Sequence, residues 1–118
     1  MKTKILIMRP ELPHETQEVE LIRDRNGSML RDLHQLLDPI VGKPGWEHVY
    51  VLADFRGGEN FKPADMFVNE MGHQLGLPHN KAATQIYRRN AIMNQGATPE
   101  ELANIVGPAV LFEKRVWR

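Results

Sequence analysis

The stretch from 66 to 80, MFVNEMGHQLGLPHN, holds the residue types that bind metals or move protons. It combines Glu70 with His73 and His79, and a carboxylate with two imidazoles is a frequent zinc ligand set. The two His are six residues apart with a Gly and a Pro between them, whereas ligands on one helical face follow an i, i+4 spacing. The stretch therefore predicts turns and a helix cap at Asn80, and we expect no metal and no cofactor.

Other catalytic patterns are missing from the chain. It contains no Cys, which excludes disulfides, thiolate zinc sites and Cys nucleophiles. Ser28 is the only Ser, lies outside any GxSxG pattern and stands where it can cap a helix. No Gly-rich segment has the spacing of a phosphate-binding loop. We assign no catalytic residue; a small enzyme acting on a nucleotide through Glu70, His73 and His79 is the alternative.

Basic residues in the segment NKAATQIYRRN, residues 80–90, indicate a binding surface on a predicted helix. They recur at helical spacing along one side, next to a Tyr, and a basic stripe of this kind can hold a phosphate or an acidic protein surface. The chain end FEKRVWR adds further basic residues and a Trp. A plain alternative is that these charges only solvate a face and complement the helix dipole. The binding interpretation predicts a partner surface made of Lys81, Tyr87, Arg88, Arg89, Arg115 and Trp117.

The overall charge bears on which partner this surface could meet. The 15 basic residues equal the 15 acidic ones, so the net charge is zero. A neutral chain has no general attraction to nucleic acid or to an anionic membrane. We therefore expect a protein or small-molecule partner, with nucleic-acid binding as a disfavoured alternative. No apolar run is long enough for a signal peptide or a membrane span, so we expect a cytoplasmic protein that does not bind membranes.

Hydrophobic periodicity predicts one α+β domain over residues 1–118, with a mixed or antiparallel sheet of about five strands. Two main helices and one short helix would pack on this sheet. The expected strands cover 2–8, 17–22, 46–55, 65–70 and 109–117, with a few residues of returning strand after a turn at 71–76. The main helices are expected at 28–41 and 80–93, and the short helix begins at Thr98.

Several local signals set the ends of these elements. Ser28 and Asn80 are expected as helix N-caps, while Gly42 and Gly96 suit the positions just past the two main helices. Pro39 is expected to stop or distort the last turn of the first helix, because it lacks an N–H.

Several short motifs occur in a fixed order along the chain. They are Val41-Gly42 after a Leu-rich helix, Glu47 in a strand, FVNEMG at 67–72, GLPHN at 76–80, ATQIYR at 83–88 and GPAVL at 107–111. Together they resemble an uncharacterised family of small phage and mobile-element proteins, most like members from phages of actinobacteria. The resemblance covers residues 17–117 and implies a domain of unknown function acting inside an infected bacterial cell. It implies a non-catalytic accessory protein, a small homo-oligomer, that binds a host protein or host small molecule during host takeover or anti-defence.

Overall fold

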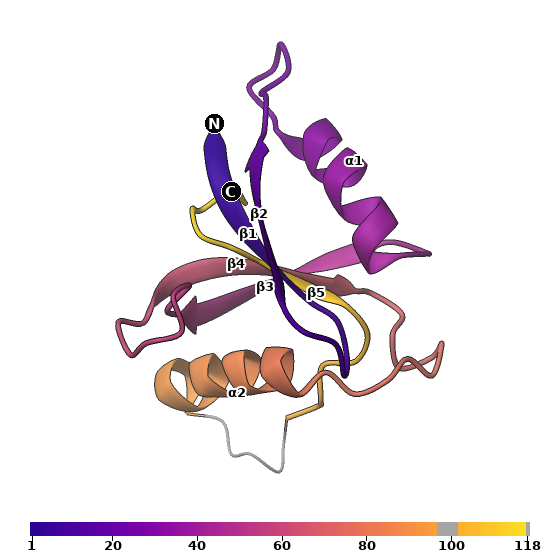
Figure 1. The fold of residues 1–118 in the computed structure, drawn as a ribbon, viewed down its shortest axis with the longest axis vertical. Helices are drawn as coiled ribbons and strands as arrows, with labels where there is room; N and C mark the ends of the chain where they lie inside the picture. The colour runs from indigo at the N-terminus through magenta and orange to yellow at the C-terminus, as the bar shows by residue number, and fades with distance from the viewer. Residues whose placement is uncertain (97–101, 118) are drawn as a thin grey trace.

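A computed structural model gives the fold of residues 1–96 and 102–117, without the side chains of residues 93–95. Five strands form one antiparallel sheet in the order β2-β1-β5-β4-β3, and two helices pack on it (Figure 1). The elements are β1 (Lys2–Met8), β2 (Glu15–Glu20), α1 (Leu30–Val41), β3 (Trp46–Ala53), β4 (Lys62–Asn69), α2 (Lys81–Gln95) and β5 (Ala109–Phe112). The predicted α+β class is confirmed. The short helix expected at Thr98 begins outside the described residues, and residues 102–105 are not helical.

The two helices lie on opposite sides of the sheet (Figure 1). Because side chains alternate along a strand, each strand serves two separate cores. On the side that we call the α1 face, α1 packs against residues such as Ile5, Phe67 and Phe112. On the α2 face, α2 packs against residues such as Val51 and Met66.

The α1 helix follows its predicted amphipathic pattern, with Leu33, Leu37 and Val41 buried. The expected N-cap Ser28 is wrong, because the helix begins at Leu30 and Met29 is its N-cap, without a side-chain cap. Ser28 precedes the cap, and its Oγ accepts a hydrogen bond from the Leu30 N–H at 3.1 Å. The helix continues past Pro39 to Val41, so this Pro does not stop it. Proline removes only one N–H, and the last turn closes through the Gly42 N–H, which donates to the Asp38 carbonyl.

Asn80 is the N-cap of α2 as predicted, and its side chain accepts a hydrogen bond from the Ala83 N–H. Gly96 ends the helix in the left-handed conformation that favours glycine. The returning strand expected within 71–76 is wrong, because these residues form successive turns. Their backbone bonds are local, such as the Leu75 N–H to the Met71 carbonyl, and leave no extended segment to pair.

Several strand boundaries also differ from the sequence-based expectation. The strand β2 covers Glu15–Glu20 rather than 17–22, and β3 ends at Ala53 rather than at residue 55. The strand β4 begins at Lys62 rather than at residue 65, and β5 ends at Phe112 rather than continuing to Trp117. Residues 113–117 leave the sheet and turn onto the α1 face, where Val116 joins the core.

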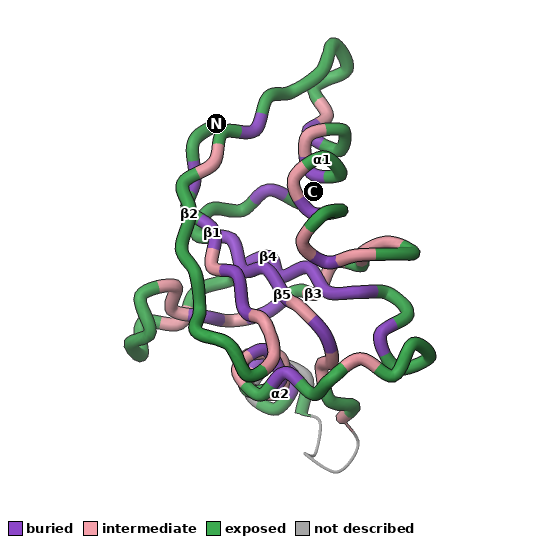
Figure 2. Tube along the Cα trace, turned by 45° about the vertical axis from the view of Figure 1, so that its right-hand side comes forward, coloured by how far each residue is buried: buried purple, intermediate pink, exposed green. Residues whose placement is uncertain are grey.

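Burial is highest in the middle strands and lowest in β2, which is exposed along nearly its whole length (Figure 2). Within the described part of the chain, neither helix is long and apolar enough to cross a membrane.

Candidate functional site

The most connected polar side chain in the described structure is Asp65, which lies on β4 and faces the α1 side. It is fully buried. Its Oδ2 accepts hydrogen bonds from the backbone N–H groups of Val116 at 2.7 Å and Trp117 at 3.0 Å. Its Oδ1 accepts from Arg115 Nε at 3.1 Å and lies 2.7 Å from His48 Nε2. One carboxylate therefore fixes the course of the C-terminal segment.

These contacts also set the ionisation of Asp65. Burial raises the pKa of a carboxyl group, because a charge is costly away from water. The hydrogen bonds from Trp117, Val116 and His48 and the charge of Arg115 outweigh burial, so the pKa of Asp65 lies below its ordinary value. Asp65 is therefore a carboxylate at neutral pH and a firm acceptor for all its partners.

Three exposed side chains surround this buried carboxylate, and we call them the anchor surface: Tyr50, Arg115 and Trp117. The Arg115 guanidinium lies 4.9 Å from the centre of the Tyr50 ring. The Trp117 ring stacks on His48 at 5.2 Å and meets the edge of Trp46 at 5.7 Å. Tyr50 is 44% and Trp117 36% exposed, so both rings show surface while other side chains hold them in place.

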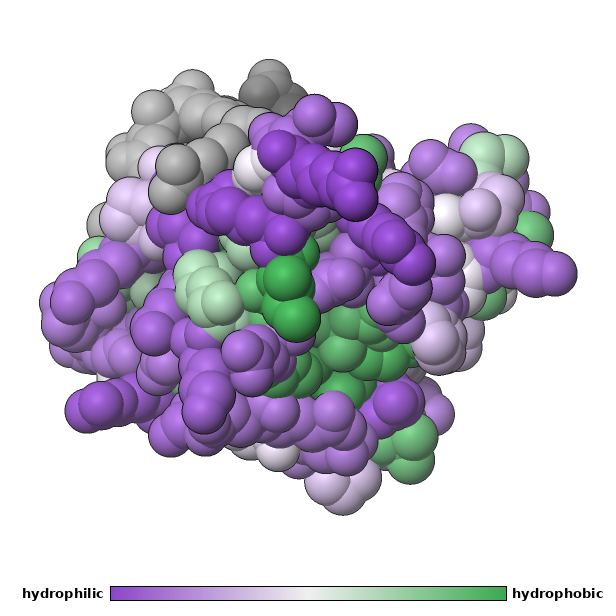
Figure 3. Space-filling model, turned by 90° about the horizontal axis from the view of Figure 1, so that it is seen from above, coloured by the Kyte–Doolittle hydropathy of each residue, from purple (hydrophilic) through white to green (hydrophobic). Residues whose placement is uncertain are grey.

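A cavity of about 430 Å³ lies beside the anchor surface, between the start of α1 and the C-terminal segment. Its lining includes Arg23, Met29, Leu30, Leu33, Val116 and Trp117. Seen from above, where the β2–α1 connection and α1 are nearest to the viewer, hydrophobic side chains gather in the middle of a mostly hydrophilic face (Figure 3). Because Trp117 also lines this cavity, the anchor surface lies next to apolar side chains that a partner could cover.

The structure divides the six partner-binding residues expected from the sequence between the two faces. Arg115 and Trp117 come together on the α1 face. The other four lie on α2, on the far side of the sheet: Lys81, Tyr87, Arg88 and Arg89. The expected single surface is therefore two separate ones.

Three of the four α2 residues are engaged within the protein. Tyr87 packs against the α2-face core. The Arg88 guanidinium donates to Asn104 Oδ1 at 2.9 Å and to the Leu102 carbonyl at 3.4 Å. The Arg89 guanidinium lies 4.2 Å from the centre of the Phe61 ring. These contacts hold neighbouring segments against α2, while Lys81 is exposed.

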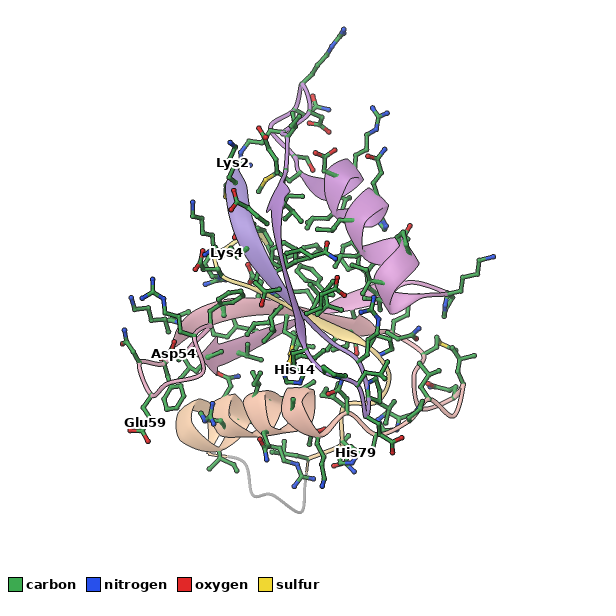
Figure 4. All side chains as sticks on the ribbon, viewed as in Figure 1. Lys2, Lys4, His14, Asp54, Glu59 and His79 are labelled. Carbon is green, nitrogen blue, oxygen red and sulfur yellow. The ribbon has the colours of Figure 1, made fainter. Side chains whose placement is uncertain are left out.

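The Glu70, His73 and His79 set that could have supported catalysis is dispersed. His73 Nε2 lies 2.8 Å from the Asn104 carbonyl, while His79 Nε2 lies 3.2 Å from Thr84 Oγ1. Figure 4 shows His79 at the start of α2. The two His line different cavities. Among residues 1–96 and 102–117, no group of three or more His, Asp or Glu is placed to hold a metal ion.

Sequence reasoning missed Asp65, His48 and Tyr50 as members of a site. One signal was present: Asp65 precedes the apolar run Met66, Phe67 and Val68, on the same side of the strand as Phe67. A buried carboxylate needs several donors, and nothing local supplies them. The sequence did not show that these donors come from the C-terminal segment.

Comparisons of the chain with family models, with curated proteins and with solved structures found no match. The resemblance to small phage proteins therefore rests on the sequence motifs alone.

Proposed function

We propose that this protein is a non-catalytic domain that binds a partner protein through the anchor surface of Tyr50, Arg115 and Trp117. The proposal rests mainly on the hydrogen bonds that buried Asp65 accepts from the C-terminal segment. These bonds hold the exposed Arg115 and Trp117 in fixed positions. Tyr, Arg and Trp are the residue types that most often dominate binding energy at protein interfaces.

The fixed positions matter for affinity. A flexible Arg or Trp loses conformational freedom on binding, which costs about 0.5–1.5 kcal/mol per side chain. Here Arg115 is already held by Asp65 and the Tyr50 ring, and Trp117 by His48 and Trp46. A partner would find these groups arranged in advance.

The resemblance to phage proteins supports a host protein as the partner and the bacterial cytosol as the place of action. On this proposal the protein is an accessory factor in host takeover or anti-defence.

A pull-down with matched variants tests the proposal. Tagged protein is incubated with nuclease-treated lysate of a candidate host, and the captured proteins are quantified by mass spectrometry. Trp117→Ala and Arg115→Ala keep the backbone N–H donors to Asp65, so both should fold. Each should lower capture of a stoichiometric partner by about tenfold or more.

The matched controls are Lys81→Ala and Arg89→Ala on α2, which should capture the partner as well as the unchanged protein does. A partner that is lost with the α2 variants and kept with Trp117→Ala would contradict the proposed surface. Thermal unfolding of each variant separates lost binding from lost structure.

A further inference from the structure

The two edges of the sheet are protected very differently. The outer strand β2 carries Glu15, Glu18 and Glu20, and its neighbour β1 places Lys4 opposite Glu18. Figure 4 shows Lys2 and Lys4 along β1. Charges along an edge discourage the pairing of a further strand. The outer strand β3, WEHVYVLA, has Glu47 as its one acidic residue and no Lys, Arg or Pro.

Three contacts show which backbone groups of β3 point away from the sheet. The Asn90 side-chain amide donates to the Tyr50 carbonyl from α2. Leu52 lies opposite Pro63, which has no N–H to donate, so this pair is not hydrogen-bonded. One step before the strand, the Glu70 N–H donates to the Gly45 carbonyl, so the odd-numbered positions pair with β4. The N–H and C=O groups of the even-numbered positions 46, 48, 50 and 52 therefore face outward.

A groove of about 420 Å³ lies on the α2 face, between the first half of β3, the end of β4, α2 and residues 103–106. Its apolar lining comes from Val49, Val68, Ile105 and Val106, and Tyr87 stands on the α2 side. His48 and Tyr50 also line it, although their side chains contact Asp65 and Arg115 on the α1 face. What these two residues present to the groove is the strand backbone.

We propose that this groove binds an extended peptide segment of the partner, which adds to β3 as a sixth strand. The outward N–H and C=O of His48 supply main-chain pairing, which is the basis of strand addition. The apolar lining accepts an apolar side chain. Among the described residues that line the groove, Glu47 is the only Asp, Glu, Lys or Arg, so a Lys or Arg of the peptide should face it.

This inference rests on the proposed function and names the shape and charge of the partner segment. The groove and the anchor surface adjoin, because Tyr50 lines the groove and belongs to the anchor surface, and His48 lines the groove and stacks on Trp117. A partner that covers the anchor surface can therefore reach the outward backbone groups of His48 on β3 with the same segment.

The experiment uses random short peptides displayed on yeast and selected against the whole protein. Enriched peptides should alternate apolar β-branched residues with a Lys or Arg. Added in solution, they should slow amide hydrogen exchange at His48 and shift the NMR signals of Val49 and Tyr87. A selection without enrichment, or peptides that leave His48 unprotected, would overturn the inference.

Matched charge variants at the two edges sharpen this test. Glu47→Lys on β3 should weaken the selected peptides about tenfold, while Glu18→Lys on β2, also exposed, should leave them unchanged. If the two variants weakened peptide binding equally, the binding would be non-specific charge attraction, and the inference would be overturned. A Pro placed at the centre of the peptide should abolish binding, since it removes a main-chain donor.

Two further outcomes separate this inference from the proposed function. If Trp117→Ala loses the lysate partner but no peptide protects His48, strand addition is wrong and the anchor surface stands. If His48 becomes protected as protein concentration rises without any peptide, the occupant is a second copy of the chain, and the peptide proposal is overturned.

Discussion

Asp65 and Asn80 are both buried polar side chains that hold distant parts of the chain together, one on each face of the sheet. Asp65 accepts hydrogen bonds from backbone groups 51 and 52 residues later in the sequence. Asn80 donates to the carbonyls of Met8 at 2.8 Å and Gly107 at 2.9 Å, and accepts from the Ala83 N–H.

The two centres differ in charge and in what they hold. Asn80 is neutral, and every partner given above is a backbone group, so it joins α2 to β1 and to the segment before β5. Asp65 is ionised, and beyond backbone groups it holds the exposed Arg115 side chain and the His48 ring beneath Trp117. We therefore interpret Asn80 as structural and Asp65 as both structural and the organiser of a surface.

The largest effect is expected from Asp65→Ala. Removing the carboxylate leaves the buried Val116 N–H, the part-buried Trp117 N–H and the Arg115 guanidinium without their acceptor. Each backbone donor left without a partner away from water costs about 1–3 kcal/mol, so the total loss should be about 3–5 kcal/mol. Urea unfolding followed by circular dichroism should show this loss in the free energy of unfolding. A loss below that of Asn80→Ala would contradict the ranking of the two centres.

Asn80→Ala should come next, with a loss of about 2–3 kcal/mol from the missing cap and two unsatisfied carbonyls. Because Asn80 does not ionise, the loss should be the same at every pH at which the protein folds. The same unfolding experiment at acid and neutral pH checks this, and a pH-dependent difference from the unchanged protein would count against it.

A smaller effect concerns pH. The folded-state pKa of Asp65 is lowered from 3.8, so its contribution to stability is complete above that value and is lost as pH falls toward the lower folded pKa. Asp65→Asn keeps the size of the side chain and removes this titration. Its free energy of unfolding should therefore depend less on pH below 3.8 than that of the unchanged protein. If the free energy of unfolding fell with pH in the same way for both proteins, Asp65 would not be the source of this pH dependence.

The smallest effect is expected on the α2 face. Arg89→Ala removes the contact with the Phe61 ring, and a half-buried interaction of this kind is worth about 1 kcal/mol. Thermal unfolding should shift only slightly, with no change in partner capture. A large loss of stability would give Arg89 a structural role comparable to that of Asn80.

The same two centres show what the sequence could and could not predict. Asn80 was predicted as a cap because its partner Ala83 is three residues away and the pattern is local. The faces of β3 and β4 and the amphipathic α1 also follow from short-range periodicity. Asp65 could not be assigned, because its donors come from a segment that sequence reasoning had placed in a continuing strand.

The basic stripe on α2 illustrates the same limit. Helical spacing correctly puts Arg88 and Lys81 on one helix, but it does not show what packs over that helix. Residues 102–104 pack beside α2, where the Leu102 carbonyl and the Asn104 side chain accept hydrogen bonds from the Arg88 guanidinium. Periodicity reports which side of an element is polar, while long-range contacts decide whether that side is free.

The position of β5 has a consequence for synthesis on the ribosome. This strand follows every other element in the chain, yet it lies between β1 and β4 and joins the two halves of the sheet. Until it emerges, the nascent chain can hold only two separate hairpins, each with an open inner edge. Ribosome stalling before Ala109 would therefore leave both halves exposed to chaperones and proteases, and the native sheet would close only when β5 has emerged.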